Sequence, residues 1–440
     1  MHWNCTQLGE LPVTFKTKLN RRALLAGTGT TFGLLAAPGI LRAQARDIRI
    51  GYITALTGSR AEFGESDPWM LEQVKKITDE GLTIDGNTYS VEFIVKDNQS
   101  NPNRSAAVGN ELIQREGVDL LLVQDLDASV AVGEMSDIAG VPSISTMGPW
   151  QAWMFGRGSN PEQGFPYSFT FFWGVEMAMQ TFVRLWEQID TNKVVGDFYF
   201  DNPAGQAFAH PELGLPAVMG NAGYSRVDGG MFQFDTQDFS GQLSKFKAAN
   251  AQIVTGFGFP PNWATFWAQA GQQGFTPEAA SFAASFLFPS AIESLGARGN
   301  GMSTEVWWTP NMPWSSSLTG QTASQMAAAW EAHSGKQWVQ TLGYSHALFE
   351  TGIAALKNSG DPKNPDAVRD AIASMNMNTM VGPVNWAGSP IKNVAVTEVA
   401  GGQWRKTNGG NHAYDLVIND NSFAPSVDVQ DRLIPLSQLG

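Results

Sequence analysis

Hydrophobic and polar positions along the chain alternate between two periods, the two-residue period of a strand and the 3.6-residue period of a helix. From Arg46 the segment RDIRIGYITAL is rich in β-branched residues and stops at the turn-like TGSRAEFGES, which predicts a strand. The next segment, 68–78, carries its apolar residues on one stripe and predicts a helix. TYSVEFIVKDNQ, VDLLLVQ and GVPSIST continue the series as further strands.

Helix starts are marked twice by Asn followed by Pro, at Asn101-Pro102 and Asn364-Pro365, where Asn caps the helix and Pro takes its first position. The same strand and helix pattern returns after Lys193, with a helix and then a strand expected within 237–258 and helices at 263–272 and 366–375. Repeated β-α-β units with near-continuous apolar strands are typical of parallel sheets covered by helices. Two such blocks, separated around 155–175, predict an α/β protein of two doubly wound lobes. In such sheets, ligands bind beyond the carboxyl ends of the strands.

The first 45 residues have the three parts of an export signal. A basic region that includes Arg21 and Arg22 precedes a Gly/Ala-rich apolar run, which ends at the small residues Ala43 and Ala45. The adjacent arginines resemble a twin-arginine signal, and an ordinary secretory signal is the alternative. We expect cleavage near Ala45, a periplasmic protein and, as a transient partner, the twin-arginine export machinery.

Composition narrows the class of partner. The formal charge is −13, and loss of residues 1–45 removes five Lys/Arg and one Glu, leaving 23 basic against 40 acidic residues, or −17. This balance argues against nucleic acid and against an anionic membrane surface, which both attract basic proteins. The single cysteine, Cys5, precedes the cleavage point, so we expect neither a disulfide nor a thiol nucleophile.

Motifs of enzymes and metal sites are missing from the sequence. It contains neither a Gly-x-Ser-x-Gly elbow nor a His-Glu-x-x-His pair, and the histidines after residue 45 lack metal-ligand spacing. We therefore expect no catalytic residues, no metal and no cofactor. A periplasmic hydrolase on an α/β scaffold remains the rival from another class.

Seven segments in order resemble the solute-binding receptors of the branched-chain amino-acid type, the type I periplasmic binding proteins. In the first lobe they are ALTGSRAEFG, VKDNQSNPNRSAAVGNELI, EGVDLLLV and GVPSISTMG. In the second they are YFDNPAGQAF, TQDFSGQLSKFKAANAQIV and GPVNWAG with the following AVTEVAGGQW. Together they cover the chain from Arg46 to about Lys406.

The resemblance implies a clamshell of two lobes joined by three crossovers, with one small-molecule ligand in the cleft and an ABC permease as membrane partner. By position we expect the crossovers at 169–173, 307–310 and 380–385. The first lobe then comprises 46–170 and 310–380, and the second comprises 171–309 and 381–440. A ligand sensor of the same fold, which regulates a partner instead of feeding a permease, remains an alternative function.

Candidate ligand contacts lie in loops after the strands and at the second crossover. They are Thr57, Gly58, Ser59, Asp125, Asp127, Ser129, Thr146, Met147, Gly148, Trp150, Asn202, Pro203, Phe257, Phe259, Phe286, Trp307 and Trp308. The loops DLDAS and STMGPW are poorer in hydroxyls and bulkier than those of amino-acid receptors, which disfavours a standard aliphatic amino acid. We expect a small aromatic or apolar ligand with one polar or charged end, such as an aromatic carboxylate, or else an amino acid or amide.

The segment WWTPNMPW, residues 307–314, concentrates three tryptophans and two prolines at the expected second crossover. Proline favours an extended connection there, because it fixes its own φ and restricts the residue before it. Neighbours in an extended segment point to opposite sides. We therefore expect one of Trp307 and Trp308 to face the cleft and the other to seal a lobe.

Overall fold

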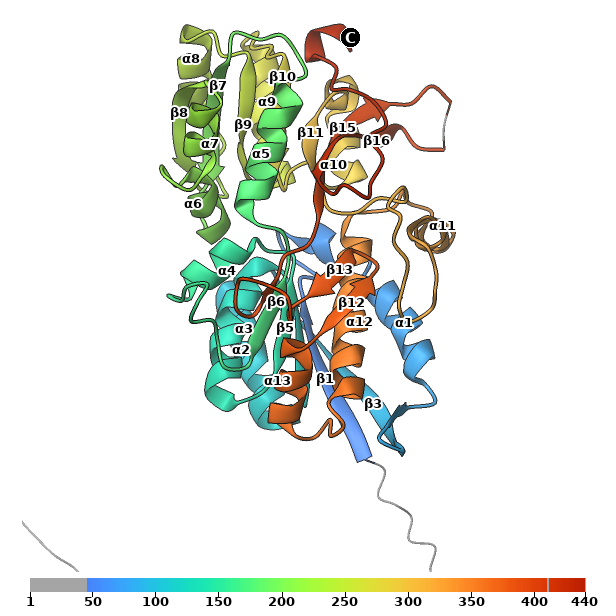
Figure 1. The fold of residues 1–440 in the computed structure, drawn as a ribbon. Helices are drawn as coiled ribbons and strands as arrows, with labels where there is room; N and C mark the ends of the chain where they lie inside the picture. Colours follow the sequence, from blue (N-terminus) through green and yellow to red (C-terminus); the bar gives the residue numbers. More distant parts are fainter. Residues whose placement is uncertain (1–45, 410, 440) are drawn as a thin grey trace, which may run out of the picture. The chain divides into compact units, whose positions relative to one another are not determined.

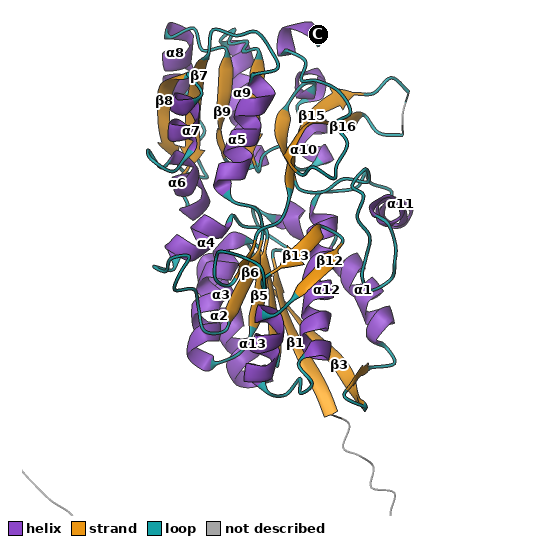
Figure 2. Cartoon of the chain, viewed as in Figure 1, coloured by secondary structure: helices purple, strands orange, loops and turns teal. Residues whose placement is uncertain are grey.

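The computed structural model describes residues 46–409 and 411–439. The export signal, with Arg21, Arg22, Ala43 and Ala45, lies outside the described residues. Two seven-stranded sheets and one two-stranded sheet account for the strands of the described ranges. Each large sheet with its flanking helices forms one lobe (Figures 1 and 2). The expected α/β fold of two doubly wound lobes is confirmed.

The first sheet has the order β14-β6-β5-β4-β1-β3-β2. All its pairings are parallel except the short antiparallel pair of β2 with β3. Its strands are β1 (Arg46–Thr54), β2 (Leu82–Ile84), β3 (Asn87–Asp97), β4 (Leu120–Gln124), β5 (Ser143–Thr146), β6 (Ser168–Phe171) and β14 (Val394–Ala395).

The second sheet has the order β16-β15-β11-β10-β9-β7-β8. Its strands from β8 to β11 are parallel, and β15 and β16 extend it by antiparallel pairing. They are β7 (Val194–Phe200), β8 (Ser225–Phe232), β9 (Ile253–Phe257), β10 (Ala279–Ala283), β11 (Ser303–Val306), β15 (Val399–Lys406) and β16 (Tyr414–Phe423). A separate hairpin joins β12 (Asn376–Thr379) to β13 (Gly382–Asn385).

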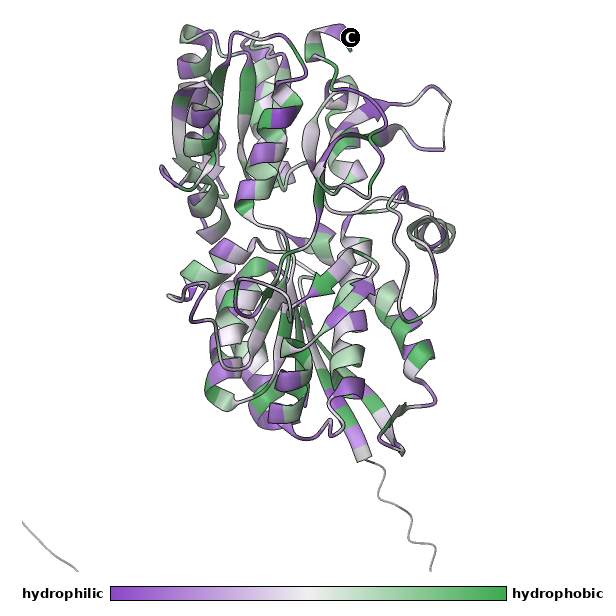
Figure 3. Ribbon diagram, in the orientation of Figure 1, coloured by the Kyte–Doolittle hydropathy of each residue, from purple (hydrophilic) through white to green (hydrophobic). Residues whose placement is uncertain are grey.

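Helices cover the sheets, and the central strands are buried beneath them, with β4, β5, β9 and β10 buried at every position. Figure 3 shows hydrophobic residues along strands of both sheets. The helices of the first lobe are α1 (Asp67–Thr78), α2 (Pro102–Glu111), α3 (Leu126–Ala139), α4 (Trp150–Gly156), α11 (Ala323–Ser334), α12 (Thr341–Asn358) and α13 (Pro365–Ala373). Those of the second lobe are α5 (Val175–Trp186), α6 (Pro203–Ala209), α7 (Leu215–Asn221), α8 (Ser240–Ala248), α9 (Pro260–Gln272) and α10 (Pro289–Ser294). None of the described helices is long and apolar enough to cross a membrane.

Local signals in the sequence correspond closely to the element starts. The Asn101 side chain accepts hydrogen bonds from the backbone N–H groups of Asn103 and Arg104, and Asn364 caps α13 in the same way. The two expected Asn-Pro helix starts are thus confirmed. Such caps satisfy donors that the first turn of a helix leaves without partners.

The chain passes between the sheets three times. It leaves β6 for α5 through 172–174, leaves β11 at Trp307, and returns from β14 to β15 through 396–398. The third passage differs from the expected 380–385, which forms the β12–β13 hairpin instead. The difference arises because β14 is only two residues long, paired in parallel with β6, and so short a strand leaves no periodic pattern.

Candidate ligand-binding site

A cavity lies where the carboxyl ends of strands from both sheets meet the first and second crossovers. Its volume is ≈ 50 Å³, and its lining is mostly apolar. The first lobe contributes Arg60, Phe63, Asp125, Leu126, Asp127, Met147 and Pro149, and the second contributes Asn202, Ala204, Phe257, Phe259, Ala284 and Glu305. Phe172, Trp173 and Trp307 line it from the two crossovers.

Unusual backbone conformations gather around this cavity. Asp125, Met147 and Ala284 have positive φ angles of 75°, 62° and 63°, and they directly follow β4, β5 and β10. The ψ angle of Asp125 is 144°, a region that L-residues rarely adopt. Strained residues of this kind persist where the surrounding structure holds them, typically at ligand sites.

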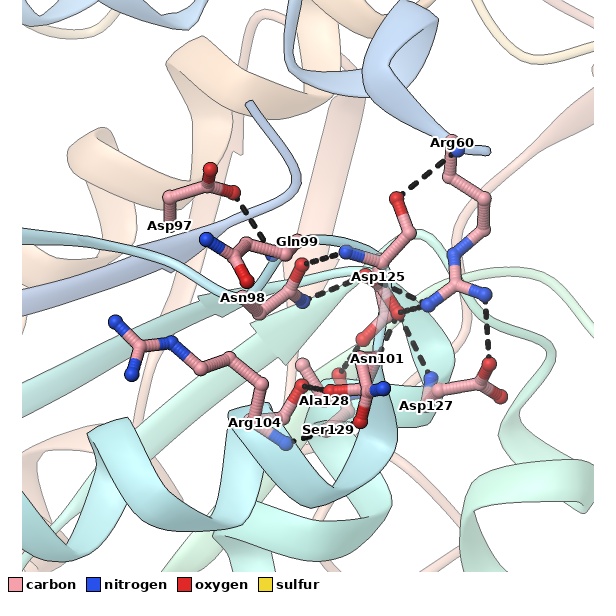
Figure 4. A network of polar contacts seen from close by, with 12 residues as sticks. Arg60, Asp97, Asn98, Gln99, Asn101, Arg104, Asp125, Asp127, Ala128 and Ser129 are labelled. Atoms are coloured by element: carbon pink, nitrogen blue, oxygen red, sulfur yellow. Dashed lines mark hydrogen bonds and ion pairs between the residues drawn. The ribbon is translucent and has the colours of Figure 1, made fainter. Parts of the chain in front are cut away.

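Asp125 is held in place by a polar network that Figure 4 shows. Its carboxylate accepts hydrogen bonds from the backbone N–H of Asp127, at 2.9 Å, and of Ala128, so it caps α3. The side-chain amide of Asn98 donates to the other carboxylate oxygen at 2.9 Å. The network fixes the start of α3 at the edge of the cavity.

Arg60 joins this network from the turn after β1. Its guanidinium lies 2.8 Å from an Asp127 carboxylate oxygen and 3.4 Å from one of Asp125. Burial alone would lower the pKa of Arg60, but the charges of Asp125 and Asp127 outweigh it and raise that pKa. Burial also raises the pKa of Asp127, against the opposing effect of Arg60. The cavity wall therefore carries a buried guanidinium between two carboxylates.

Glu305 approaches the cavity from the second lobe, at the end of β11. It is fully buried, and its carboxylate accepts a hydrogen bond from the backbone N–H of Ala284 at 2.9 Å and one from the Thr304 hydroxyl at 3.0 Å. Burial raises the pKa of Glu305 to about 7, although these hydrogen bonds act in the opposite direction. A carboxyl group that titrates near neutrality thus lines the cavity.

Aromatic rings surround the charged groups. The ring of Trp307 lies 4.9 Å from that of Phe172 and 6.0 Å from that of Trp173, measured between centroids. Phe63 reaches across to Phe259 of the second lobe at 6.3 Å. Aromatic faces of this kind bind apolar groups, rings and organic cations.

Seven of the seventeen expected ligand contacts line the cavity, and the other ten do not. The seven are Asp125, Asp127, Met147, Asn202, Phe257, Phe259 and Trp307. The ten are Thr57, Gly58, Ser59, Ser129, Thr146, Gly148, Trp150, Pro203, Phe286 and Trp308.

Competing contacts explain most of these ten positions. The Thr57 hydroxyl donates to Asp97 at 2.6 Å, which holds the loop 57–59 at the surface. Ser129 and Thr146 donate to backbone carbonyls inside the first lobe. Pro203 is exposed while Asn202 and Ala204, its neighbours, line the cavity.

The large aromatics among the ten pack elsewhere. Phe286 packs against Trp263 of α9, and its carbonyl accepts the indole N–H of Trp404. Trp150 begins α4 and packs against Phe155. Trp308 lies against Trp338, whereas Trp307 lines the cavity, so the expectation that these two tryptophans face opposite sides is confirmed.

Nine lining residues are not among the seventeen expected contacts, although Leu126, Pro149 and Ala204 lie in the expected loops and the sequence also offers Arg60 as a candidate charge for the ligand. Arg60 and Glu305 matter most among the nine because they carry charge. Arginine and glutamate are common residue types, and most of those in the sequence are expected to be exposed. Position was the only available signal: Arg60 follows the loop after β1, and Glu305 directly precedes the second crossover. Within the described ranges, no group of three or more His, Cys, Asp or Glu side chains could hold a metal ion.

The arrangement of two α/β lobes with a cavity at their crossovers is that of the clamshell class of solute-binding proteins. A family model described as periplasmic binding protein matches residues 47–408, and the chain belongs to that family.

Solved structures share its fold at low identity. A branched-chain amino acid transporter substrate-binding protein from Streptococcus pneumoniae, in complex with isoleucine, is 18% identical with a TM-score of 0.65, over 85% of this chain and 100% of its own. An ABC transporter substrate-binding protein from Sphaerobacter thermophilus is 20% identical with a TM-score of 0.69, over 88% and 100%. A solute-binding protein of an ABC transporter from Rhodopseudomonas palustris, in complex with 3,4-dihydroxybenzoic acid, is 17% identical with a TM-score of 0.67, over 88% and 98%.

Stability should fall as pH rises from 6.5 to 8. Burial raises the pKa of Glu305 and of Glu350 to about 7, above the 4.5 of a free side chain, so the folded state binds more protons here than the unfolded state. The contribution of each carboxyl group to the free energy of unfolding then falls by about 0.8 kcal/mol between pH 6.5 and 8. His346, whose pKa burial lowers to about 4, opposes this by about 0.4 kcal/mol, because its unfolded form still sheds protons.

The net expected loss is about 1 kcal/mol, measured by urea denaturation at both pH values. Glu305→Gln should remove about half of the carboxyl contribution. An unfolding free energy that rises over this interval would contradict the expectation.

Proposed function

We propose that the protein is a periplasmic solute receptor that delivers a small organic ligand to an ABC permease in the inner membrane. The single observation that carries this proposal is the aromatic cavity lined from both lobes and both neighbouring crossovers. Membership of the periplasmic binding protein family supports it, as do the transporter receptors among the similar structures. The role is binding, with no catalytic step.

The mechanism that we propose is a shift between open and closed clamshells. A ligand that touches Asp127 and Leu126 of the first lobe can touch Phe257 and Glu305 of the second only when the lobes meet. Such a ligand binds the closed form more tightly and so raises its population. The permease would then recognise the closed form.

The ligand should have an apolar or aromatic body and one polar end. The rings of Phe63, Phe172, Trp173 and Trp307 supply contacts of roughly 0.5–2 kcal/mol each. The sequence left the polar end open among a carboxylate, an amino acid and an amide. Isoleucine, benzoate and 3,4-dihydroxybenzoic acid accompany three of the similar receptors, which supports a ligand of that size range.

A thermal-shift screen of the chain from Arg46 onward tests the receptor function. The panel comprises amino acids, aromatic acids, amides and organic ammonium compounds, each at 1 mM. A ligand present at 100 times its Kd should add about 2.7 kcal/mol of stability and raise Tm by several degrees. If no compound raises Tm, and calorimetry with the same panel also detects no binding, the receptor proposal fails.

Export by the twin-arginine route is the second part of the proposal, and the pair Arg21-Arg22 supports it. Replacing both with Lys preserves the charge of the basic region but removes the arginine pair. We expect the precursor to accumulate in the cytoplasm, detected by immunoblot of cell fractions. Unchanged periplasmic yield would instead indicate the ordinary secretory route.

A further inference from the structure

Four ionisable side chains line the cavity, and three of them are acidic. They are Asp125, Asp127 and Glu305, with Arg60 as the single base. Asp125, Glu305 and Arg60 are each at most 8% exposed, so water screens their charges poorly. The lining therefore carries more negative than positive charge at a pH where all four groups are ionised.

The charge of Arg60 is already paired with carboxylates of the protein. Its guanidinium contacts the carboxylates of Asp125 and Asp127, at 3.4 Å and 2.8 Å. A ligand carboxylate would have to compete with two buried carboxylates for the same cation and would bring a third negative charge beside them. The triad therefore disfavours an anionic ligand.

Glu305, in contrast, receives hydrogen bonds from uncharged groups, among them the Ala284 N–H and the Thr304 hydroxyl. Among the described residues, no cationic side chain forms an ion pair with Glu305 at 4 Å or less. Its neighbour across the strand pair on β15 is Gly401, which has no side chain to offer. A buried carboxylate without a cation beside it is costly, so the group is partly protonated near pH 7, and a positive charge that approaches it would stabilise the ionised form.

The aromatic lining also fits a cation. Phe63, Phe172, Trp173 and Trp307 supply ring faces, and organic cations bind to such faces through the ring quadrupole. The indole N–H of Trp173, a residue 2% exposed, has no hydrogen-bond partner among the described residues. An N–H donor of this kind does not bind a cation and would pair only with an oxygen that the ligand carries elsewhere.

The surroundings of the cavity are acidic too. The neighbouring groove between the lobes is lined by Glu62, Glu65 and Glu293, and Lys336, its basic residue, is already paired with Glu65. A groove with an excess of acidic groups raises the local concentration of cationic solutes. This arrangement favours the approach of a cation over that of an anion.

We propose that the cavity binds a small organic ammonium ion, primary or quaternary, with Glu305 as its counter-ion and the aromatic rings around its apolar groups. This inference rests on the proposed receptor function and names the charge of its ligand. The cavity volume of ≈ 50 Å³ is smaller than the about 150 Å³ of an apolar cavity that binds benzene, so volume does not distinguish an ammonium head group from a ring. The sequence favoured an aromatic carboxylate, whose charge has the opposite sign to that of the proposed ammonium ion.

Isothermal titration calorimetry with charge-matched probes tests the proposal. Choline, 3,3-dimethylbutan-1-ol and 3,3-dimethylbutanoate share a tert-alkyl shape and carry a positive, no and a negative charge. Benzylammonium, benzyl alcohol and benzoate form a second series with a ring. We expect the cation to bind at least tenfold more tightly than its neutral and anionic counterparts in at least one series.

Glu305→Gln identifies the counter-ion, with Glu350→Gln as the matched control. Gln at 305 can still accept from Ala284 and donate to the Thr304 hydroxyl, so the fold should tolerate it. Glu350 is equally buried, and its pKa is also raised to about 7 by burial, but its partners are Ser317 and Met380, away from the cavity. We expect Glu305→Gln to reduce the preference for the cation at least tenfold and Glu350→Gln to leave it unchanged.

The affinity for choline, whose charge does not titrate, supplies a second readout. It should rise up to about tenfold from pH 6 to 8 as Glu305 ionises, and Glu305→Gln should remove most of that rise. Arg60, Asp125 and Asp127 are the other charged groups of the lining and remain in both proteins.

Each remaining outcome decides between the two proposals. Tighter binding of the neutral or anionic probes, or binding of amino acids and benzoates without any cation, would overturn the ammonium assignment and leave the receptor function standing. A cation preference that survives in Glu305→Gln would also overturn the assignment. Absence of binding by every compound, including the thermal-shift panel, would overturn the receptor function itself.

Discussion

Trp308→Ala should lower the free energy of unfolding by about 3–5 kcal/mol, the usual cost of removing a buried tryptophan. The Trp308 side chain is fully buried and meets Trp338 edge-on, with ring centroids 6.2 Å apart. It also packs so closely on α12 that a Cβ added at Gly343 would lie 2.3 Å from its ring. Trp338 in turn stacks on Trp404 of β15 in the second sheet. Urea denaturation of the variant measures the loss.

Its neighbour Trp307 supplies the matched comparison. Trp307→Phe and Trp308→Phe make the same chemical change one residue apart, but only Trp307 lines the cavity. For the compound that raises Tm most, we expect Trp307→Phe to weaken binding about 2- to 30-fold and Trp308→Phe to leave it unchanged. Loss of affinity in Trp308→Phe without loss of stability would contradict this division of roles.

The pair 307–308 illustrates what the sequence could predict. Extended backbone turns adjacent side chains to opposite sides, so local geometry alone separates a cavity residue from a seam residue. Which of the two faces the cavity depends on Phe172, Trp173 and Gly343, and these contacts join residues far apart in the chain. Periodicity and caps are local, so most strands and helices could be predicted, whereas side-chain partners could not.

The candidate site divides in the same way. Strand ends could be located, and therefore Asp125, Met147 and Phe257 were found directly after β4, β5 and at the end of β9. The loop 57–59 was also at a strand end, yet Asp97 of the next strand holds it at the surface. Glu305 carries no local mark that distinguishes it from an exposed glutamate; only burial beside Ala284 does. Of the four charges in the cavity, that of Glu305 was therefore the one that sequence reasoning could least anticipate.

Arg60→Met should lower the free energy of unfolding by about 3–5 kcal/mol at pH 7.5, because it leaves two buried carboxylates without their cation. Met replaces the aliphatic part of the side chain and removes the charge. Asp125 keeps Asn98 and two backbone N–H donors, but among the residues that the structure describes the Asp127 carboxylate has only the ion pair with Arg60. The deficit should therefore shrink as the pH is lowered, because protonation of Asp127, whose pKa is already raised by burial, removes one of the two unpaired charges.

A second substitution and a surface control isolate the charge effect. Asp127→Asn added to Arg60→Met should recover about half of the lost stability, because it neutralises the carboxylate with the fewest other partners. Arg369 also pairs with two aspartates, Asp366 and Asp370, but both are mostly exposed, so Arg369→Met should cost at most about 1 kcal/mol. Either of two results would contradict the claim that Arg60 neutralises buried carboxylates. In the first, Arg60→Met and Arg369→Met lower the free energy of unfolding equally; in the second, Asp127→Asn restores none of it. The negative charge that we assign to the cavity would then have to be accounted for without the ion pairs of Arg60 with Asp125 and Asp127.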